Sequence, residues 1–226
     1  MKVPNVLKSR LRQLLHPDVL PGWGAQQLAC PPGRPKDLPQ KIQTARRAGV
    51  VCLLCWEAPK GWGVVLMKRT QDGSPHSGQW AFPGGAEEAC DEGDLERTAR
   101  RECQEEIGVL LNDAEVMGAL SPLYIPPSHF FVQPIVAVAE GPLAFVLQEE
   151  EVAEVCVVPL SDLPEAGRPW KAMEVRVKHG KAQAPGWAMK EGVLWGATAM
   201  MTAELIEVCA RAGFGRSFAD ENDLRS

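Results

Sequence analysis

One run of nine residues, 101–109 with the sequence RECQEEIGV, constrains the fold more than any other segment. Its glutamates, Glu102, Glu105 and Glu106, stand at i, i+3 and i+4, so on a helix they are neighbours, and such like-charge pairs each cost roughly 0.2–0.5 kcal/mol. Arg101 can offset Glu105 at i+4, but no residue of the run is expected to offset Glu102 or Glu106. The run therefore indicates either a solvated acidic face or a site for a multivalent cation.

The helical wheel favours the cation site. Successive helical residues are about 100° apart, and this places four apolar residues on one face, as expected for a helix that packs on a core. They are Leu95, Ala99, Cys103 and Ile107. Glu102 and Glu106 fall at the edge of this stripe, with Glu105 further from it. Because carboxylates at the boundary of a core are costly unless they are paired or coordinated, we expect these two to have a partner.

A glycine pair, Gly84-Gly85, ends the sequence FPGG that precedes the acidic helix. Glycine lets the backbone approach a metal or a phosphate with no side chain in the way. Residues 85–109 contain nine acids and three bases, whereas the rest of the chain is close to neutral. Such focused negative charge would repel a polyphosphate unless cations intervened, and it argues against a broad nucleic-acid surface.

Together these residues resemble the signature of Nudix hydrolases, G-x5-E-x7-R-E-U-x-E-E-x-G-U, where U is an aliphatic residue. The matching positions are Gly85, Arg101, Glu102, Glu105, Glu106, Gly108 and Val109, with Cys103 at the first U. The interval from Gly85 to Arg101 is two residues longer than in the signature. The intermediate glutamate of the signature has no clean counterpart, the nearest acids being Asp91 and Glu92.

The resemblance implies an α/β (α+β) fold, a Nudix-type α/β/α sandwich with a mixed β-sheet between helices. It implies that Glu102, Glu105 and Glu106, with the backbone carbonyl of Gly85, hold Mg²⁺ or Mn²⁺, which prefer hard oxygen ligands. It also implies that Arg101 orients one of the glutamates. Which glutamate acts as the general base stays open.

The flanking sequence narrows the substrate class. Residues 76–85, HSGQWAFPGG, resemble the extension of coenzyme A pyrophosphatases, although Ser74-Pro75 stands where that subfamily carries Leu-Arg. The resemblance extends over roughly residues 17–205.

We expect Gly84, Gly85, His76 and Arg69 to contact substrate, and strand alternation favours Arg69 over its neighbour Lys68. A turn histidine without a role is the alternative for His76. By resemblance to the superfamily, Glu151 is the candidate for a fourth carboxylate near the metals.

The chain is thus expected to be a metal-dependent Nudix hydrolase that cleaves CoA or a CoA derivative into 3′,5′-ADP and a 4′-phosphopantetheine. The alternatives are the same chemistry on ADP-ribose, dinucleoside polyphosphates or oxidised nucleotides, or a non-catalytic Nudix-fold binding module. Because all three glutamates of the signature are present, the binding module is the weakest of these. For the 3′-phosphate of CoA the candidates are Lys41, Arg46 and Arg47, which precede the first predicted strand.

The chain divides into three predicted parts: an N-terminal helix with an extended Pro-rich arm at residues 1–42, a Nudix domain at 43–213 and a polar tail at 214–226. Strands are predicted by their apolar runs and alternation, and a closing helix by its long apolar stretch. The predicted strands are 48–57, 64–69, 79–82, 115–125, 131–139, 151–159 and 173–177, and the helices are 1–16, 94–107 and 193–212.

Seven cysteines without paired spacing favour a reducing compartment. Cys52 and Cys55 form a C-x-x-C, but they lie in an apolar run and are expected to be buried thiols rather than zinc ligands. The basic N-terminus indicates an amphipathic helix, with a mitochondrial presequence as the alternative. We expect a cytoplasmic enzyme with a nucleotide-containing, CoA-like substrate, no nucleic-acid or membrane partner, and a homodimer as an open option.

Overall fold

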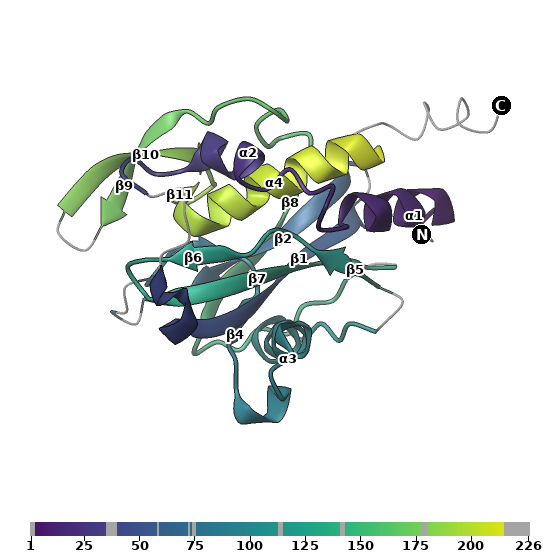
Figure 1. The fold of residues 1–226 in the computed structure, drawn as a ribbon, viewed down its shortest axis with the longest axis horizontal. Coiled ribbons are helices and arrows are strands. Elements are labelled where there is room, and N and C mark those ends of the chain that lie inside the picture. The colour runs from purple at the N-terminus through teal and green to yellow at the C-terminus, as the bar shows by residue number, and fades with distance from the viewer. Residues whose placement is uncertain are drawn as a thin grey trace.

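The computed structural model describes residues 3–34, 40–57, 59–71, 73, 76–112, 115–140, 143–177 and 180–214. Its centre is an eight-stranded sheet (Figure 1). The main path runs β3-β2-β1-β7-β5, while β4 pairs with β1, β6 with β7 and β8 with β2. β1 and β7 are parallel and the other pairs are antiparallel, which confirms the predicted mixed sheet. The strands are β1 (Arg46–Glu57), β2 (Gly61–Arg69), β3 (Trp80–Ala81), β4 (Gly84–Ala86), β5 (Val116–Ala119), β6 (Leu123–Ile125), β7 (Phe130–Val138) and β8 (Val152–Pro159).

Helices cover both faces of this sheet, with α4 and α1 on one side and α3 on the other (Figure 1). The longer helices are α1 (Asn5–Leu14), α3 (Leu95–Ile107) and α4 (Gly196–Ala212); shorter pieces are α2 (Trp23–Gln26), η1 (Gln27–Ala29), η2 (Gln40–Thr44) and η3 (Ala89–Asp91). Along β1, Cys52 and Leu54 pack in the core beneath α4, whereas Val51 and Leu53 pack in the core beneath α3. Because successive strand residues point to opposite faces, a strand buried on both sides has a continuous apolar sequence.

A separate three-stranded antiparallel sheet contains β9 (Ala172–Val177), β10 (Gly180–Ala188) and β11 (Val193–Trp195). The strand predicted at 173–177 is confirmed as β9. The predicted helix at 193–212 is wrong at its start, since its first three residues form β11 and the helix begins at Gly196. Ladder pairing of Val193 with Ala188 and of Trp195 with Gly186 holds this segment in the sheet.

Two further sequence predictions need correction. The single strand predicted at 115–125 is divided into β5 and β6. Both pair with β7, but Ala119 lies opposite Ile135 and Leu123 opposite Val132, so this segment has one residue more than β7 between the two pairs and the ladder is interrupted. The arm expected to be extended contains the short helical pieces α2 and η1. The polar tail predicted from residue 214 lies outside the described residues except for Phe214, and the division into three parts stays a prediction.

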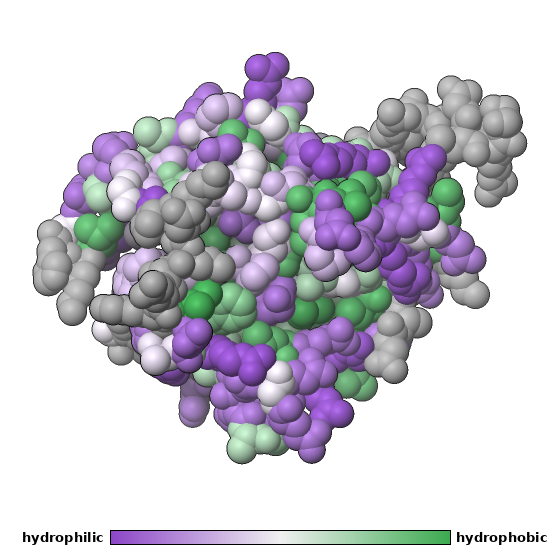
Figure 2. All heavy atoms as spheres, in the orientation of Figure 1, coloured by the Kyte–Doolittle hydropathy of each residue, from purple (hydrophilic) through white to green (hydrophobic). Residues whose placement is uncertain are grey.

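The described part of the chain contains no helix with both the length and the apolar character needed to cross a bilayer. The face shown in Figure 2 mixes hydrophobic and hydrophilic side chains, and its lower part, over α3 and the loop before it, is largely hydrophilic. The acid-rich segment therefore presents charge on its outer side and apolar residues to the sheet.

Candidate active site

Helix α3 has a defined start and a defined end. Asp94 caps its N-terminus, accepting hydrogen bonds from Glu96 N–H (2.9 Å) and Arg97 N–H (3.5 Å). Gly108 ends it with φ 73°, the left-handed conformation that glycine adopts without strain. These two signals set the residues at which the helix begins and ends.

The predicted stripe of α3 is confirmed, with Ala99, Cys103 and Ile107 fully buried. The side chains of Glu106 and Glu102 are 2% and 14% exposed, whereas that of Glu105 is 53% exposed. Two carboxylates therefore lie at the core boundary, as the helical wheel predicted.

Glu106 is the most deeply buried of the three. Its Oε2 accepts a hydrogen bond from Gly84 N–H at 2.7 Å, and its Oε1 lies 3.6 Å from Arg69 Nη1. Burial raises the pKa of Glu106 to about 8. The negative charges of Glu102 and Glu151 raise this pKa further, whereas the hydrogen bond from Gly84 and the positive charge of Arg69 lower it. Burial also raises the pKa of Glu102. Burial therefore disfavours the charged form of both groups, and a further positive charge beside them would oppose this effect.

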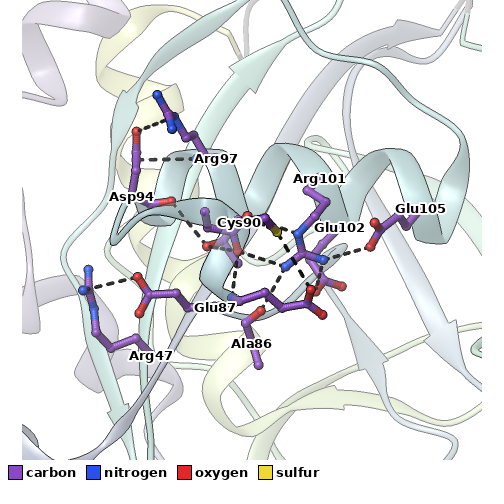
Figure 3. Close-up of polar contacts among 12 residues, drawn as sticks. Arg47, Ala86, Glu87, Cys90, Asp94, Arg97, Arg101, Glu102 and Glu105 are labelled. Carbon is purple, nitrogen blue, oxygen red and sulfur yellow. Dashed lines mark hydrogen bonds and ion pairs between the residues drawn. The ribbon is translucent and has the colours of Figure 1, made fainter.

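Arg101 connects the glutamates to the loop before the helix (Figure 3). Its Nη1 donates to Glu102 Oε1 (2.9 Å) and to Glu105 Oε2 (2.8 Å), and its Nη2 donates to Ala86 O (3.1 Å). The expectation that nothing in the run offsets Glu102 is therefore wrong, because adjacent residues can meet when one side chain is as long as arginine. Arg101 thus contacts two glutamates, whereas the resemblance implied that it orients one.

Asp91 is the partner of Arg101 on the loop side. Its two carboxylate oxygens accept from Arg101 Nε (3.1 Å) and Nη2 (3.0 Å), and it also accepts from Thr98 Oγ1 and Glu88 N–H. The hydrogen bonds from Arg101 lower the pKa of Asp91 to about 2. Asp91 stands six residues after Gly85, the interval at which the Nudix signature has its intermediate glutamate. The two extra residues therefore lie between Asp91 and Arg101. The interval from Gly85 was the sequence signal that could have identified Asp91 as the counterpart of the intermediate glutamate.

The two glycines of β4 allow close approach of the backbone to the acidic helix. A Cβ at Gly85 would lie 2.5 Å from Glu102 Cδ and Oε2, and one at Gly84, where φ is 148°, would lie 2.4 Å from Gly49 O. β4 pairs with β1, which sets Gly85 opposite Gly49. Any side chain at position 85 would occupy the space in front of the Glu102 carboxylate.

Glu151 lies close enough to the cluster for its charge to raise the pKa values of both Glu102 and Glu106. Its backbone oxygen accepts from Thr70 N–H (2.9 Å), which ties the start of β8 to the end of β2. The structure thus brings Glu151 to the predicted site, with its side chain exposed.

Of the side chains predicted to contact substrate, Arg69 lies at the carboxylate cluster and His76 lies in the turn before β3. Arg69 points at the buried end of the cluster, whereas its neighbour Lys68 pairs with Glu191 at 2.6 Å, as strand alternation predicted. The ring of His76 contacts the side chain of Gln79 at 3.3 Å in the turn before β3. No described contact joins His76 to the carboxylates.

The donor set fits a hard divalent cation in composition. Carboxylate oxygens are the ligands that such a cation prefers, Gly85 has no side chain to obstruct the Glu102 carboxylate, and burial raises the pKa values of Glu102 and Glu106. Within the described residues, however, no three acidic, histidine or cysteine side chains converge as ligands of one ion. Arg101 holds Glu102 and Glu105, while Gly84 N–H and Arg69 hold Glu106.

The fold and this acidic helix define a Nudix hydrolase, and the chain belongs to the Nudix family: the NUDIX domain matches residues 45–176. It accordingly acts on nucleoside diphosphate derivatives. A curated relative, the uncharacterized Nudix hydrolase NudL of Pectobacterium atrosepticum, is 33% identical over 171 residues, covering 76% of this chain and 86% of the relative.

Two further proteins are similar to this chain. The peroxisomal coenzyme A diphosphatase ndx-8 of Caenorhabditis elegans is 34% identical over 129 residues, which cover 57% of this chain and 55% of that protein. A crystal structure of a MutT/nudix family protein from Enterococcus faecalis superposes with a TM-score of 0.52 at 16% identity, covering 94% of this chain and 81% of that one. This last match shows the shared fold.

Proposed function

We propose that this Nudix hydrolase cleaves CoA or a CoA derivative within its diphosphate, giving 3′,5′-ADP and a 4′-phosphopantetheine product. The observation that carries the proposal is the similarity to a coenzyme A diphosphatase, 34% identical over 129 residues. The HSGQWAFPGG segment at residues 76–85 supports it, because this segment resembles the extension of coenzyme A pyrophosphatases. Its last two residues, Gly84 and Gly85, lie beside the acidic helix.

The segment is fixed against the strands that carry the site. Arg69 N–H donates to Gln79 O (3.0 Å) and Gly78 N–H donates to Thr70 O (3.1 Å), so the turn closes over the end of β2. Trp80 is buried, and its indole N–H donates to Glu191 O (2.6 Å). The segment that resembles the coenzyme A pyrophosphatase extension is therefore joined to Arg69, which in turn contacts Glu106.

Glu102, Glu105 and Glu106, with the Gly85 carbonyl, would hold Mg²⁺ or Mn²⁺. The bound cation supplies charge neutralisation on the diphosphate and makes water a better nucleophile. Arg101 would keep Glu102 and Glu105 in place. Glu151, whose charge acts on both Glu102 and Glu106, is a further candidate for the base, and which carboxylate takes the proton stays open.

In this reaction, water adds to one phosphorus and the anhydride oxygen leaves with the other phosphate. Arg69, whose Nη1 lies 3.6 Å from Glu106 Oε1, would balance charge on the departing phosphate.

The test is a hydrolysis screen of the purified protein with Mg²⁺ and with Mn²⁺, using CoA, acetyl-CoA, ADP-ribose, NADH and a diadenosine polyphosphate. Release of 3′,5′-ADP from CoA, abolished by EDTA, is the expected result. Turnover of ADP-ribose or of the dinucleotide in place of CoA would replace the CoA assignment with the other Nudix substrates, and no turnover at all would favour the binding module.

Glu105→Gln is the matched variant for this screen, since Glu105 is half exposed and its loss leaves the core intact. Removing a group that acts in the transition state is expected to reduce kcat by roughly 100-fold or more. Glu96→Gln is the control, because Glu96 lies on the same helix, is partly exposed and forms an i,i+4 pair with Arg100. Retention of most activity by a folded Glu105→Gln protein would refute the assigned metal site. A cytoplasmic location and a homodimer stay predictions.

A further inference from the structure

The three-stranded sheet ends in a strand whose outer edge is free. β9 pairs with β10 on one side, and in the part of the chain that the structure describes no other strand pairs with it. Figure 1 shows the hairpin of β9 and β10 at one end of the molecule, away from helix α3. Ala172, Glu174 and Arg176 of β9 are exposed, so this edge is open to another chain.

The hydrogen-bond pattern of the hairpin identifies the backbone groups that line this edge. Gly186 N–H donates to Lys171 O at 3.0 Å, so Lys171 directs its carbonyl toward β10. In an antiparallel ladder, alternate residues point their N–H and C=O groups to the same neighbour. Residues 173, 175 and 177 therefore also face β10, whereas residues 172, 174 and 176 face outward. Among the described residues, no loop or cap hydrogen bond joins these outward groups to another segment, and a further strand would complete the edge.

The side chains along this edge have an unmatched positive charge. Arg176 lies directly opposite Lys181 of β10, and like charges in this arrangement are destabilising. Glu174 Oε1 pairs with Lys181 Nζ at 2.6 Å, whereas no carboxylate of the described residues pairs with Arg176. A carboxylate placed opposite Arg176 across the free edge would offset its charge.

A second copy of this chain has a carboxylate at the required position. When two β9 strands pair antiparallel about a two-fold axis at Val175, Glu174 of each copy lies opposite Arg176 of the other. Both residues face outward, so each of these pairs exchanges two main-chain hydrogen bonds. On the other face of the sheet, Val175 lies beside its own counterpart and Met173 lies beside Val177 of the second copy, which adds apolar contact.

Charge and hydrogen bonding together select this register. An axis at Glu174 or at Arg176 also pairs outward-facing residues, but it places two glutamates or two arginines directly opposite each other. An axis between two residues would pair an outward-facing residue with an inward-facing one and lose the hydrogen bonds. Val175 is therefore the axis position that satisfies both conditions, and a self-complementary contact of this kind closes as a dimer.

We infer that the free edge of β9 is a homodimer interface, at which the three-stranded sheets of two copies join into one continuous sheet. This inference goes beyond the proposed function and does not depend on it. The interface is small compared with the roughly 1,600 Å² of a standard one. Residues 168–190 contain six bases and one acid, so repulsion between the copies opposes association. We therefore expect a weak dimer, with a Kd in the micromolar range.

Sedimentation velocity over a range of protein concentrations tests the inference. The average mass should rise with concentration from the 24.6 kDa of one chain toward that of a dimer. Arg176→Glu places glutamates opposite each other at both pairs and should raise the Kd by roughly 10-fold or more. Arg168→Glu is the matched control, because it makes the same charge change at an exposed residue that precedes β9. A monomer at every concentration, or a dimer that Arg176→Glu leaves intact, would overturn the inference.

A mixing experiment separates edge pairing from a general effect of charge. Glu174→Arg alone should also weaken the dimer, because it sets arginines opposite each other. In an equal mixture with Arg176→Glu, one chain has two arginines on the edge and the other has two glutamates, so every pair of a mixed dimer joins opposite charges. The mixture should therefore dimerise more strongly than either variant alone, and failure to do so would refute the register.

The double variant Glu174→Arg/Arg176→Glu exchanges the two charges within one chain. It should dimerise like the wild-type protein, and it provides the same test of the register where one single variant fails to fold. Thermal unfolding of each variant shows whether it is folded. A double variant that is folded but stays monomeric while the wild-type protein dimerises would refute the pairing of Glu174 with Arg176.

Discussion

Among single residues, the contact between Arg101 and Asp91 links the acidic helix to its loop. Asp91 is 3% exposed and receives two hydrogen bonds from the guanidinium. We expect Asp91→Asn to lower the free energy of unfolding by about 2 kcal/mol, because one charge-assisted pair at a buried position is lost. Urea unfolding measures this change. Glu92→Gln is the control, since Glu92 forms an exposed pair with Arg97 and should change stability by less than about 0.5 kcal/mol.

The same pair has a defined pH dependence. The pKa of Asp91 is lowered to about 2 in the folded protein, from its ordinary value of 3.8. Its contribution to stability is therefore fully present above pH 3.8 and is lost as the pH falls toward 2. Equal stability of the Asp91→Asn and wild-type proteins at pH 6 would show that Arg101 is held adequately by its other partners.

Glu106 has the opposite dependence. Because the pKa of Glu106 is raised to about 8 in the folded protein, its carboxyl keeps its proton well above pH 4.5. In the unfolded chain the same carboxyl has its ordinary pKa of 4.5 and releases the proton above that pH. In metal-free protein, stability is therefore expected to decrease between about pH 4.5 and pH 8, by a few kcal/mol, at roughly 1.4 kcal/mol per unit of pKa shift. Thermal unfolding in EDTA at pH 5.5 and pH 8 tests this, and Glu106→Gln should remove most of the difference. An unchanged pH slope in that variant would assign the effect to other groups.

Among the elements, helix α3 depends on how it ends. A Cβ at Gly108 would lie 2.8 Å from Val146 Cβ and 3.0 Å from Val146 O, and φ there is 73°. We expect Gly108→Ala to destabilise the protein by about 1–3 kcal/mol, combining the left-handed backbone cost with the collision. The matched control is Gly24→Ala on α2, where a Cβ meets nothing within 4 Å; it should be neutral or stabilising by up to about 1 kcal/mol. Chemical denaturation of both variants compares them directly, and equal effects would refute this role of the helix end.

The orientation of this helix was predictable from its sequence. The burial of Glu102 and Glu106 follows from the 3.6-residue period alone, because the apolar positions fix which face packs on the sheet. The contact of Arg101 with Asp91 was not predictable in this way, since it depends on how the intervening loop folds. The interval from Gly85 to Asp91 was visible in the sequence, but only the structure shows that the inserted residues follow Asp91 rather than precede it.

Strand boundaries were less predictable where tertiary pairing decides them. Residues 193–195 have an apolar sequence that continues smoothly into α4, yet β10 pairs with them and delays the helix. β10 itself has little alternation and contains Pro185 and Gly186, so no sequence pattern indicated it. The contact of the Arg46 guanidinium with the Phe130 ring likewise joins residues far apart in the chain, brought together by the parallel pairing of β1 with β7.

At the scale of the whole molecule, one buried carboxylate joins three distant segments. Glu204 on α4 is fully buried, and it accepts hydrogen bonds from Gly22 N–H (3.0 Å), Gln26 Nε2 (2.8 Å) and Ser121 Oγ (2.7 Å). The N-terminal arm, the turn between β5 and β6, and the last helix are thereby held together. The same arm carries Arg34, whose Nη2 donates to the backbone oxygen of Tyr124 on β6.

Glu204→Ala is therefore expected to destabilise the protein by about 2–4 kcal/mol, because it leaves buried donors of the arm and the turn without an acceptor. It should also release the arm before the rest of the molecule unfolds. Hydrogen exchange tests this: the amides of residues 20–30 should exchange faster in the variant while those of β1 and β7 stay protected. Glu207→Ala, which removes a partly exposed i,i+4 pair with Arg211 on the same helix, should cost no more than about 0.5 kcal/mol. Uniformly faster exchange across the sheet would show that Glu204 supports the whole core rather than the arm.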